Sequence, residues 1–191
     1  MRPTRQELAA AQDRTIPDVT PPAGGVLISG INPSLYSAAT GHHFARPGNR
    51  FWPALHHSGW TPRLLTPAEQ GLLPEYGLGI TNLVARATAR ADELTRDELA
   101  EGGEILAGLV ARTRPDLLAV AGVTAYRTAF RRPKASIGLQ ADMLGDARIW
   151  VLPNPSGLNA SWSLERIAGE LARLRAAAAQ RGLPRDRSRL P

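Results

Sequence analysis

The chain has 191 residues, of which 43% are hydrophobic, and this predicts one domain with a sizeable apolar core. It contains no cysteine, so disulfides, iron–sulfur clusters, cysteine-bound zinc and cysteine nucleophiles are excluded. The formal net charge of +6 is carried almost entirely by arginine, because Lys134 is the only lysine, and this balance allows nucleic-acid binding without requiring it.

The two ends of the chain differ from its middle. Residues 1–24 combine a short helical pattern at 5–11 with several prolines, so we expect a mostly extended N-terminal arm. Residues 179–191 are rich in arginine and predict a basic, disordered tail. The N-terminus lacks an apolar signal core and no long apolar run occurs, so we expect a cytoplasmic protein without a membrane span.

Between residues 25 and 178, short apolar runs alternate with helical patterns and their capping residues. In chain order, the first half predicts a strand at 26–29, a long loop at 30–49, helices at 50–58 and 67–73, and a strand at 78–82. The second half predicts a polar connection at 85–94, a helix at 96–112, a strand at 116–121 and a helix at 124–130. An irregular segment follows at 131–145, with at most a weak edge strand, and the domain ends with a strand at 148–152 and a helix at 164–175.

This alternation is typical of βαβ units. We therefore expect an α/β fold, a three-layer α/β/α sandwich around a central, mainly parallel four-stranded sheet, formed by residues 25–178. The inward face of helix 96–112 should carry its large apolar residues, namely Leu99, Ile105, Leu106, Leu109 and Val110.

A polar loop begins where the first strand ends, with the sequence Gly30-Ile31-Asn32-Pro33-Ser34. In open α/β sheets, ligands bind outside the carboxyl ends of the strands. Pro33 keeps Asn32 out of the helical region and holds the turn. We therefore expect the Asn32 amide to be fixed at the edge of the sheet, beside backbone N–H groups that can face a ligand.

The last strand ends in a related loop, with the sequence PNPSGLN at 153–159. Either loop alone is equally typical of an ordinary structural turn. Together GINPS and NPSGLN, with GHHFARPGNRFW at 41–52 and GITNLV at 79–84, resemble the motifs of the mismatch-specific uracil/thymine DNA glycosylases, a family of the uracil-DNA glycosylase superfamily. The resemblance extends over most of the chain, from residue 26 to residue 178.

The resemblance implies a monofunctional DNA glycosylase of base excision repair. Such an enzyme excises uracil, and in some cases other damaged or mispaired bases, by flipping the base out of the duplex and hydrolysing its N-glycosidic bond. Excision opposite guanine would be favoured, because unstacking costs least for a mispaired base. No lysine lies in a motif to form a Schiff base, which is consistent with hydrolysis that leaves the strand uncut.

The resemblance also implies roles for individual residues. Asn32 would position the attacking water. The base-binding pocket would consist of Gly30, Ile31, Ser37, Phe44 and Asn154. In that pocket, the Ile31 backbone would contact a uracil carbonyl and the Phe44 ring would stack on the base. Asn154 stands where other branches use a histidine to assist the leaving group, so we expect slower turnover than in those branches.

The second loop would contact the duplex through Ser156, Gly157, Leu158 and Asn159. Leu158 would fill the gap left by the flipped base, and Gly157 and Asn159 would meet the opposite guanine. This chain departs from the family pattern at Ser34, often glycine, and at Ala160, where some members carry arginine. We expect a tighter first loop and a weaker mispair preference.

Two further interpretations come from the residues themselves. Asp92 and Glu93 lie in the connection after the second strand, and Asp92 is the preferred candidate for a general base that activates the water, although most loop carboxylates are merely solvated. His42 or His43 can touch phosphate or the flipped base. Adjacent histidines usually point apart, so no metal site is expected.

We expect the partner to be double-stranded DNA with uracil mismatches, and we expect no cofactor and a monomer. Two other functions stay open. One is a small-molecule α/β enzyme that binds a nucleoside or phosphate, and the other is a nucleic-acid-binding module without catalysis.

Overall fold

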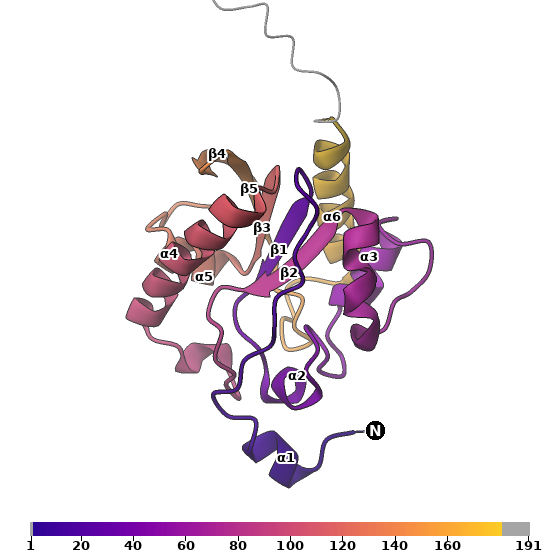
Figure 1. Ribbon diagram of the computed structural model, residues 1–191, viewed down its shortest axis with the longest axis vertical. Helices are drawn as coiled ribbons and strands as arrows, with labels where there is room; N and C mark the ends of the chain where they lie inside the picture. The colour runs from indigo at the N-terminus through magenta and orange to yellow at the C-terminus, as the bar shows by residue number, and fades with distance from the viewer. Residues whose placement is uncertain (1, 181–191) are drawn as a thin grey trace, which may run out of the picture.

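The sheet is the centre of the molecule (Figure 1). The computed structural model describes residues 2–180, and its five strands are β1 (Val26–Gly30), β2 (Leu78–Asn82), β3 (Leu117–Ala121), β4 (Gly138–Leu144) and β5 (Ala147–Leu152). Their order is β2-β1-β3-β5-β4. All neighbours are parallel except β4, which pairs antiparallel with β5.

The expected α/β class is therefore confirmed, but the strand number is wrong, since the sheet has five strands and not four. The additional strand, β4, lies in the segment expected to be irregular. Its residues alternate between half-buried and exposed, and its pairing with β5 is interrupted between Leu139 and Met143. An edge strand of this kind has no continuous apolar run, which explains its weak signal in the sequence.

Helices cover both faces of the sheet, which gives three layers (Figure 1). The helices α3 (Phe51–His57) and α6 (Leu164–Ala179) pack on one face, and α4 (Arg96–Thr113) and α5 (Val123–Ala129) pack on the other. The central strands are buried on both sides because alternate side chains enter opposite layers. In β1, for example, Val26 and Ile28 join the first layer and Leu27 joins the second.

The α4 helix corrects one predicted core residue. Ile105 was expected to face inward, but it is 63% exposed. The buried stripe of α4 consists of Gly102, Gly103, Leu106 and Val110. A Cβ on Gly102 would stand 2.3 Å from the Leu83 carbonyl oxygen, so glycine lets this side of the helix approach the sheet and turns Ile105 outward.

Short elements fill the connections. The loop expected at 30–49 contains a short helix, α2 (Leu35–Thr40), which is capped by Ser34 and ends at Gly41. The helix expected at 67–73 is instead a 3-10 helix, η1 (Pro67–Tyr76), with Pro74 inside it. A 3-10 turn, η2 (Ala91–Glu93), precedes α4. The boundaries of the other helices differ from those expected by a few residues.

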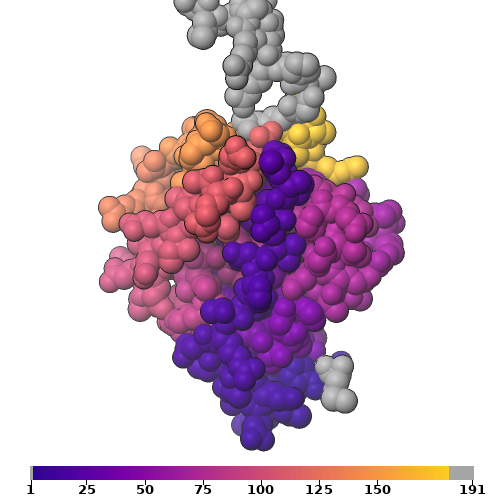
Figure 2. Space-filling model, viewed as in Figure 1, coloured from indigo at the N-terminus to yellow at the C-terminus, as the bar shows by residue number. Residues whose placement is uncertain are grey.

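The N-terminal arm lies against the domain. After α1 (Arg5–Ala9), the chain runs along the outer edge of β2, where Val19 exchanges two backbone hydrogen bonds of 2.9 and 2.8 Å with Ile80. Figure 2 shows this segment, in indigo, lying across the front of the molecule. The basic tail expected at 179–191 lies outside the described residues apart from residues 179 and 180.

The strand order places a crevice at one end of the sheet. Because β1 lies between β2 and β3, the connections that leave β1 and β2 run in opposite directions across the sheet. This is a topological switch point, at which α/β proteins bind ligands beside the carboxyl ends of the strands. No helix among residues 2–180 is long and apolar enough to cross a membrane.

Candidate active site

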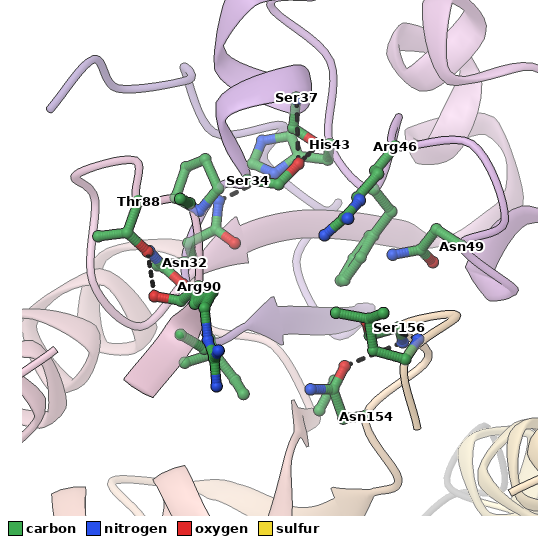
Figure 3. A pocket seen from close by; sticks show the side chains of 18 of the residues that line it. Asn32, Ser34, Ser37, His43, Arg46, Asn49, Thr88, Arg90, Asn154 and Ser156 are labelled. Atoms are coloured by element: carbon green, nitrogen blue, oxygen red, sulfur yellow. Dashed lines mark hydrogen bonds between the residues drawn. The ribbon is translucent and has the colours of Figure 1, made fainter. Parts of the chain in front are cut away.

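A pocket of about 660 Å³ opens at the carboxyl ends of the parallel strands (Figure 3). Most of its lining comes from three segments far apart in the sequence, namely the loop after β1, the connection after β2 and the loop after β5, and Ile16 of the N-terminal arm and Ala121 at the end of β3 complete it. Asn32 and Leu158 both line it, so the two asparagine-proline loops meet at this end of the sheet. The predicted residues that line the pocket are Ile31, Asn32, Ser37, His43, Phe44, Asp92, Asn154, Ser156, Leu158 and Asn159.

The amide of Asn32 is held in one orientation. Its Nδ2 donates to the Arg86 carbonyl oxygen at 3.1 Å and to Thr88 Oγ1 at 2.7 Å. The Thr88 hydroxyl in turn donates to the Arg90 carbonyl at 2.7 Å, so its oxygen can only accept from Asn32. Both partners are acceptors, and this leaves Asn32 Oδ1 as the atom that can accept a hydrogen bond from a water in the pocket.

Phe44 forms an aromatic wall of the pocket. Its backbone has a φ of 53°, in the left-handed region that phenylalanine rarely adopts, and its ring stacks on Phe51 with 4.3 Å between centroids. Ser37 Oγ accepts from the Ala45 backbone N–H at 3.1 Å, which fastens this strained turn to α2. Backbone strain of this kind is typical of a functional site.

Gly30 lies behind this wall and is absent from the pocket lining. A Cβ at Gly30 would stand 2.6 Å from Asn82 Oδ1 and 3.1 Å from the Phe44 ring. Glycine is therefore required for two pocket side chains to approach the end of β1.

Asn82 and His43 form a second fixed amide. Asn82 ends β2 and lines the pocket, and its Nδ2 lies 3.2 Å from His43 Nδ1. His43 is 1% exposed, and burial lowers the pKa of its ring below the usual 6.5, which keeps the ring neutral at pH 7. Its other nitrogen, Nε2, lies 3.1 Å from the carbonyl oxygen of Pro17 in the arm.

The loop after β5 is held by Arg50. The guanidinium donates to the backbone carbonyls of Ser156, Trp162 and Asn159, the last at 2.8 Å. The Arg50 backbone N–H also donates to the Pro155 carbonyl at 2.9 Å. One side chain at the start of α3 thus fixes the loop around Leu158, which is itself 73% exposed.

The loop after β5 also has internal bonds. Asn154 Oδ1 accepts from the Ser156 backbone N–H at 3.0 Å, and the Asn154 carbonyl accepts from Asn159 Nδ2 at 2.9 Å. Gly157 does not line the pocket, and a Cβ there would stand 2.7 Å from the Gly48 carbonyl oxygen, so glycine allows this loop to touch the first one.

Asp92 lines the pocket, but its carboxylate is paired with Arg90. Arg90 Nε and Nη2 donate to the two carboxylate oxygens at 3.0 and 2.6 Å. Both side chains are largely exposed, at 72% for Arg90 and 63% for Asp92. In Figure 3, Arg90 lies beside Asn32 and Thr88, and Arg46 and Asn49 lie across the pocket.

The sequence alone did not identify the full site. It suggested that His42 or His43 contacts a ligand, and His43 does line the pocket, although both of its ring nitrogens lie within hydrogen-bonding distance of protein atoms. Arg50 and Asn82 stand in the motifs at 41–52 and 79–84, but the sequence assigned them no role, and Thr88 carried no signal that separates it from ordinary loop residues. Among residues 2–180, no group of three or more histidine and acidic side chains is arranged to hold a metal ion.

Comparisons with known proteins agree with this geometry. A sequence model of the Uracil DNA glycosylase superfamily matches residues 17–177. The fold is similar to the solution structure of a candidate uracil DNA glycosylase from Methanosarcina acetivorans, with a TM-score of 0.59 and 21% sequence identity over 86% of this chain and 97% of that one. Because the matched segment covers most of the chain, the protein belongs to the uracil DNA glycosylase superfamily.

Proposed function

We propose that the protein is a monofunctional DNA glycosylase that excises uracil from DNA, especially opposite guanine, by base flipping and hydrolysis of the N-glycosidic bond. The observation that carries the proposal is the Asn32 amide, whose nitrogen is occupied by two acceptors in a pocket large enough to hold a flipped nucleotide. The pocket also has an aromatic wall and an exposed leucine on its rim.

In this mechanism Asn32 Oδ1 accepts a hydrogen bond from the water and directs its lone pair at C1′ of the flipped nucleotide. The C1′–N1 bond breaks and its electron pair stays on the base, while the water oxygen bonds to C1′. An amide orients water but does not take its proton. Neutral donors in the pocket, including Asn154, are available to the developing base anion.

Base recognition is assigned to Phe44 and Asn82. The Phe44 ring offers a face for stacking. The amide of Asn82 offers an acceptor and a donor side by side, which complement the N3–H and O4 of uracil. Cytosine has the opposite arrangement, an acceptor at N3 and a donor at N4, and would leave both groups unpaired, which is costly once the bound base excludes water.

Leu158 is assigned to the space that the flipped base leaves in the duplex. Its side chain is 73% exposed and lines the pocket, and Arg50 holds its loop in place. Ser156, Gly157 and Asn159 would then lie against the opposite strand. The basic side chains Arg46 and Arg90 at the pocket mouth suit contacts to phosphates.

Asp92 is proposed as the group that takes the proton from the water. Because Arg90 occupies both carboxylate oxygens, this role requires that Arg90 moves to a DNA phosphate when substrate binds. Asp92→Asn should then lower the single-turnover rate by about a hundredfold, the usual contribution of a general base. An Asp92→Asn variant with full activity would remove Asp92 from the mechanism.

The test is base release from oligonucleotides containing G·U, A·U or G·T pairs, or uracil in a single strand, followed by alkali. Strand breaks that appear only after alkali support the proposal, with G·U cleaved fastest. Asn32→Ala should abolish release, whereas Gln12→Ala, which truncates an exposed side chain outside the pocket, should not.

The same experiment separates the two alternatives. Turnover of free nucleoside without release from DNA would indicate a small-molecule enzyme. Salt-sensitive DNA binding without base release would indicate a binding module.

A further inference from the structure

The N-terminal arm reaches the pocket through His43. Three consecutive arm residues contact this region: the Pro17 carbonyl meets His43 Nε2 at 3.1 Å, Asp18 accepts from Thr81 Oγ1 at 2.6 Å, and Val19 pairs with Ile80. Figures 1 and 2 show the arm running beside β2 on the outside of the molecule. The arm is therefore bonded both to the strand that carries Asn82 and to the histidine behind it.

These contacts fix the tautomer of His43. A carbonyl oxygen can only accept, so the nitrogen that faces Pro17 must carry the hydrogen. A neutral imidazole has one hydrogen, which leaves Nδ1 as an acceptor. Nδ1 faces the amide of Asn82, so that amide must present its nitrogen to the ring and keep its oxygen on the other side, next to Gly30.

We propose that His43 is a positioning residue whose tautomer, set by the Pro17 carbonyl, determines which way the Asn82 amide faces and so which pyrimidine edge the pocket accepts. This inference rests on the proposed function, because Asn82 matters only if a base is read. It adds that the N-terminal arm, which contributes Ile16 to the pocket lining, also helps to determine base specificity.

Protonation of His43 would reverse the arrangement. With a hydrogen on Nδ1, the ring can no longer accept from Asn82, and the amide must turn its oxygen toward the ring. The groups that surround the ring are Asp18 on the arm, which favours protonation, and His42 on the same loop, which opposes it. The remaining polar neighbours, Trp52 and Gln70, are uncharged and bond to the His43 backbone.

The first test needs no activity. In the full-length, 15N-labelled protein, the His43 ring should carry its hydrogen on Nε2 from pH 7 to pH 8 and should titrate below pH 6.5. A hydrogen on Nδ1, or titration at or above pH 6.5, would overturn the proposal.

The second test is the pH profile of single-turnover uracil release. In the wild type, release should fall as the pH drops through the His43 pKa measured by NMR. His43→Phe should remove this pH-dependent decrease and lower the maximal rate about tenfold, which corresponds to the loss of one hydrogen bond that orients the amide. His42→Phe is the matched control, since the His42 ring has no hydrogen-bond partner at its buried Nδ1. It should retain the maximal rate and the pH-dependent decrease, and the decrease should move to higher pH because His42 no longer opposes protonation of His43.

A third variant acts through the arm and keeps the histidine. Val19→Pro removes the backbone N–H that donates to Ile80, whereas Val19→Thr keeps it. Val19→Pro should lower uracil release and raise the population of the Nδ1–H tautomer, and Val19→Thr should do neither.

A folded His43→Phe protein with an unchanged profile would overturn the proposal. If the wild type releases no uracil at any pH, the proposed function fails instead, and the NMR experiment still decides the tautomer.

Discussion

Arg50 offers the sharpest test of the loop that carries Leu158, because a single guanidinium donates to three carbonyls of that loop. A hydrogen bond to a charged group contributes roughly 1.5–3 kcal/mol, and the three carbonyls are half-buried, so water replaces part of what is lost. Arg50→Ala should therefore destabilise the ordered conformation of the loop by about 3 kcal/mol. This corresponds to a roughly hundredfold smaller population of molecules whose loop is in the ordered conformation.

The assay is single-turnover uracil release from a G·U duplex and from a single strand. Only the duplex has a gap that Leu158 must fill, so the duplex rate should fall about a hundredfold and the single-strand rate only a few-fold. Arg50→Lys keeps the charge but not the planar fork, and should give an intermediate loss.

Arg166→Ala is the matched control for Arg50→Ala. The Arg166 guanidinium donates to one loop carbonyl, that of Ser161 at 2.8 Å, and lies over the Trp162 ring. Its removal should change either rate by less than about tenfold, since exposed contacts contribute at most about 1 kcal/mol. Equal losses on duplex and single strand after Arg50→Ala would refute the assignment of this loop to the duplex.

Three further predictions concern single sites. Gly30→Ala would place a Cβ 2.6 Å from Asn82 Oδ1, so uracil release should fall at least about tenfold while the unfolding free energy in urea drops by only about 1–2 kcal/mol. Leu158→Ala truncates a side chain that is 73% exposed, so its unfolding free energy should stay within about 0.5 kcal/mol of the wild type while release from duplex, but not from single strand, decreases. Because the His43 pKa is lowered in the folded state, the unfolded chain binds more protons than the folded one just below pH 6.5. The contribution of His43 to the unfolding free energy should therefore be fully present above pH 6.5 and should decline as the pH falls below it. The check is the pH dependence of unfolding in His43→Phe, whose decline should be shallower.

The sequence predicted the parts of the fold that have strong local signals. The apolar runs of β1, β3 and β5 are buried on both faces, and such runs are readable without any tertiary information. In contrast, β4 is held by pairing with β5, and its exposed alternate residues give no local signal. Ile105 was misplaced for a related reason, since close packing of glycines at 102 and 103 decides the rotation of α4.

The same distinction applies to the site. Asn32 and Leu158 could be predicted because each stands in a motif after a strand, and the sheet topology brings such loops together. The residues that orient them could not, because Thr88 and Arg50 act through hydrogen bonds to partners 56 and 106 positions away. The Arg90 partner of Asp92 is only two residues distant, yet the sequence did not show that the carboxylate would be occupied.

Both amides proposed to act on substrate are oriented by acceptors on their nitrogen side: carbonyl and hydroxyl oxygens for Asn32, and an imidazole nitrogen for Asn82. A side-chain amide can exchange the positions of its oxygen and nitrogen by rotation at little cost, so its neighbours determine which of the two atoms faces the substrate. Neutral amides of this kind depend on preorganisation by the groups to which they are hydrogen-bonded. It follows that Thr88→Val, which removes one of the two acceptors of Asn32 but keeps the side-chain shape, should lower single-turnover uracil release more than its small change in volume suggests.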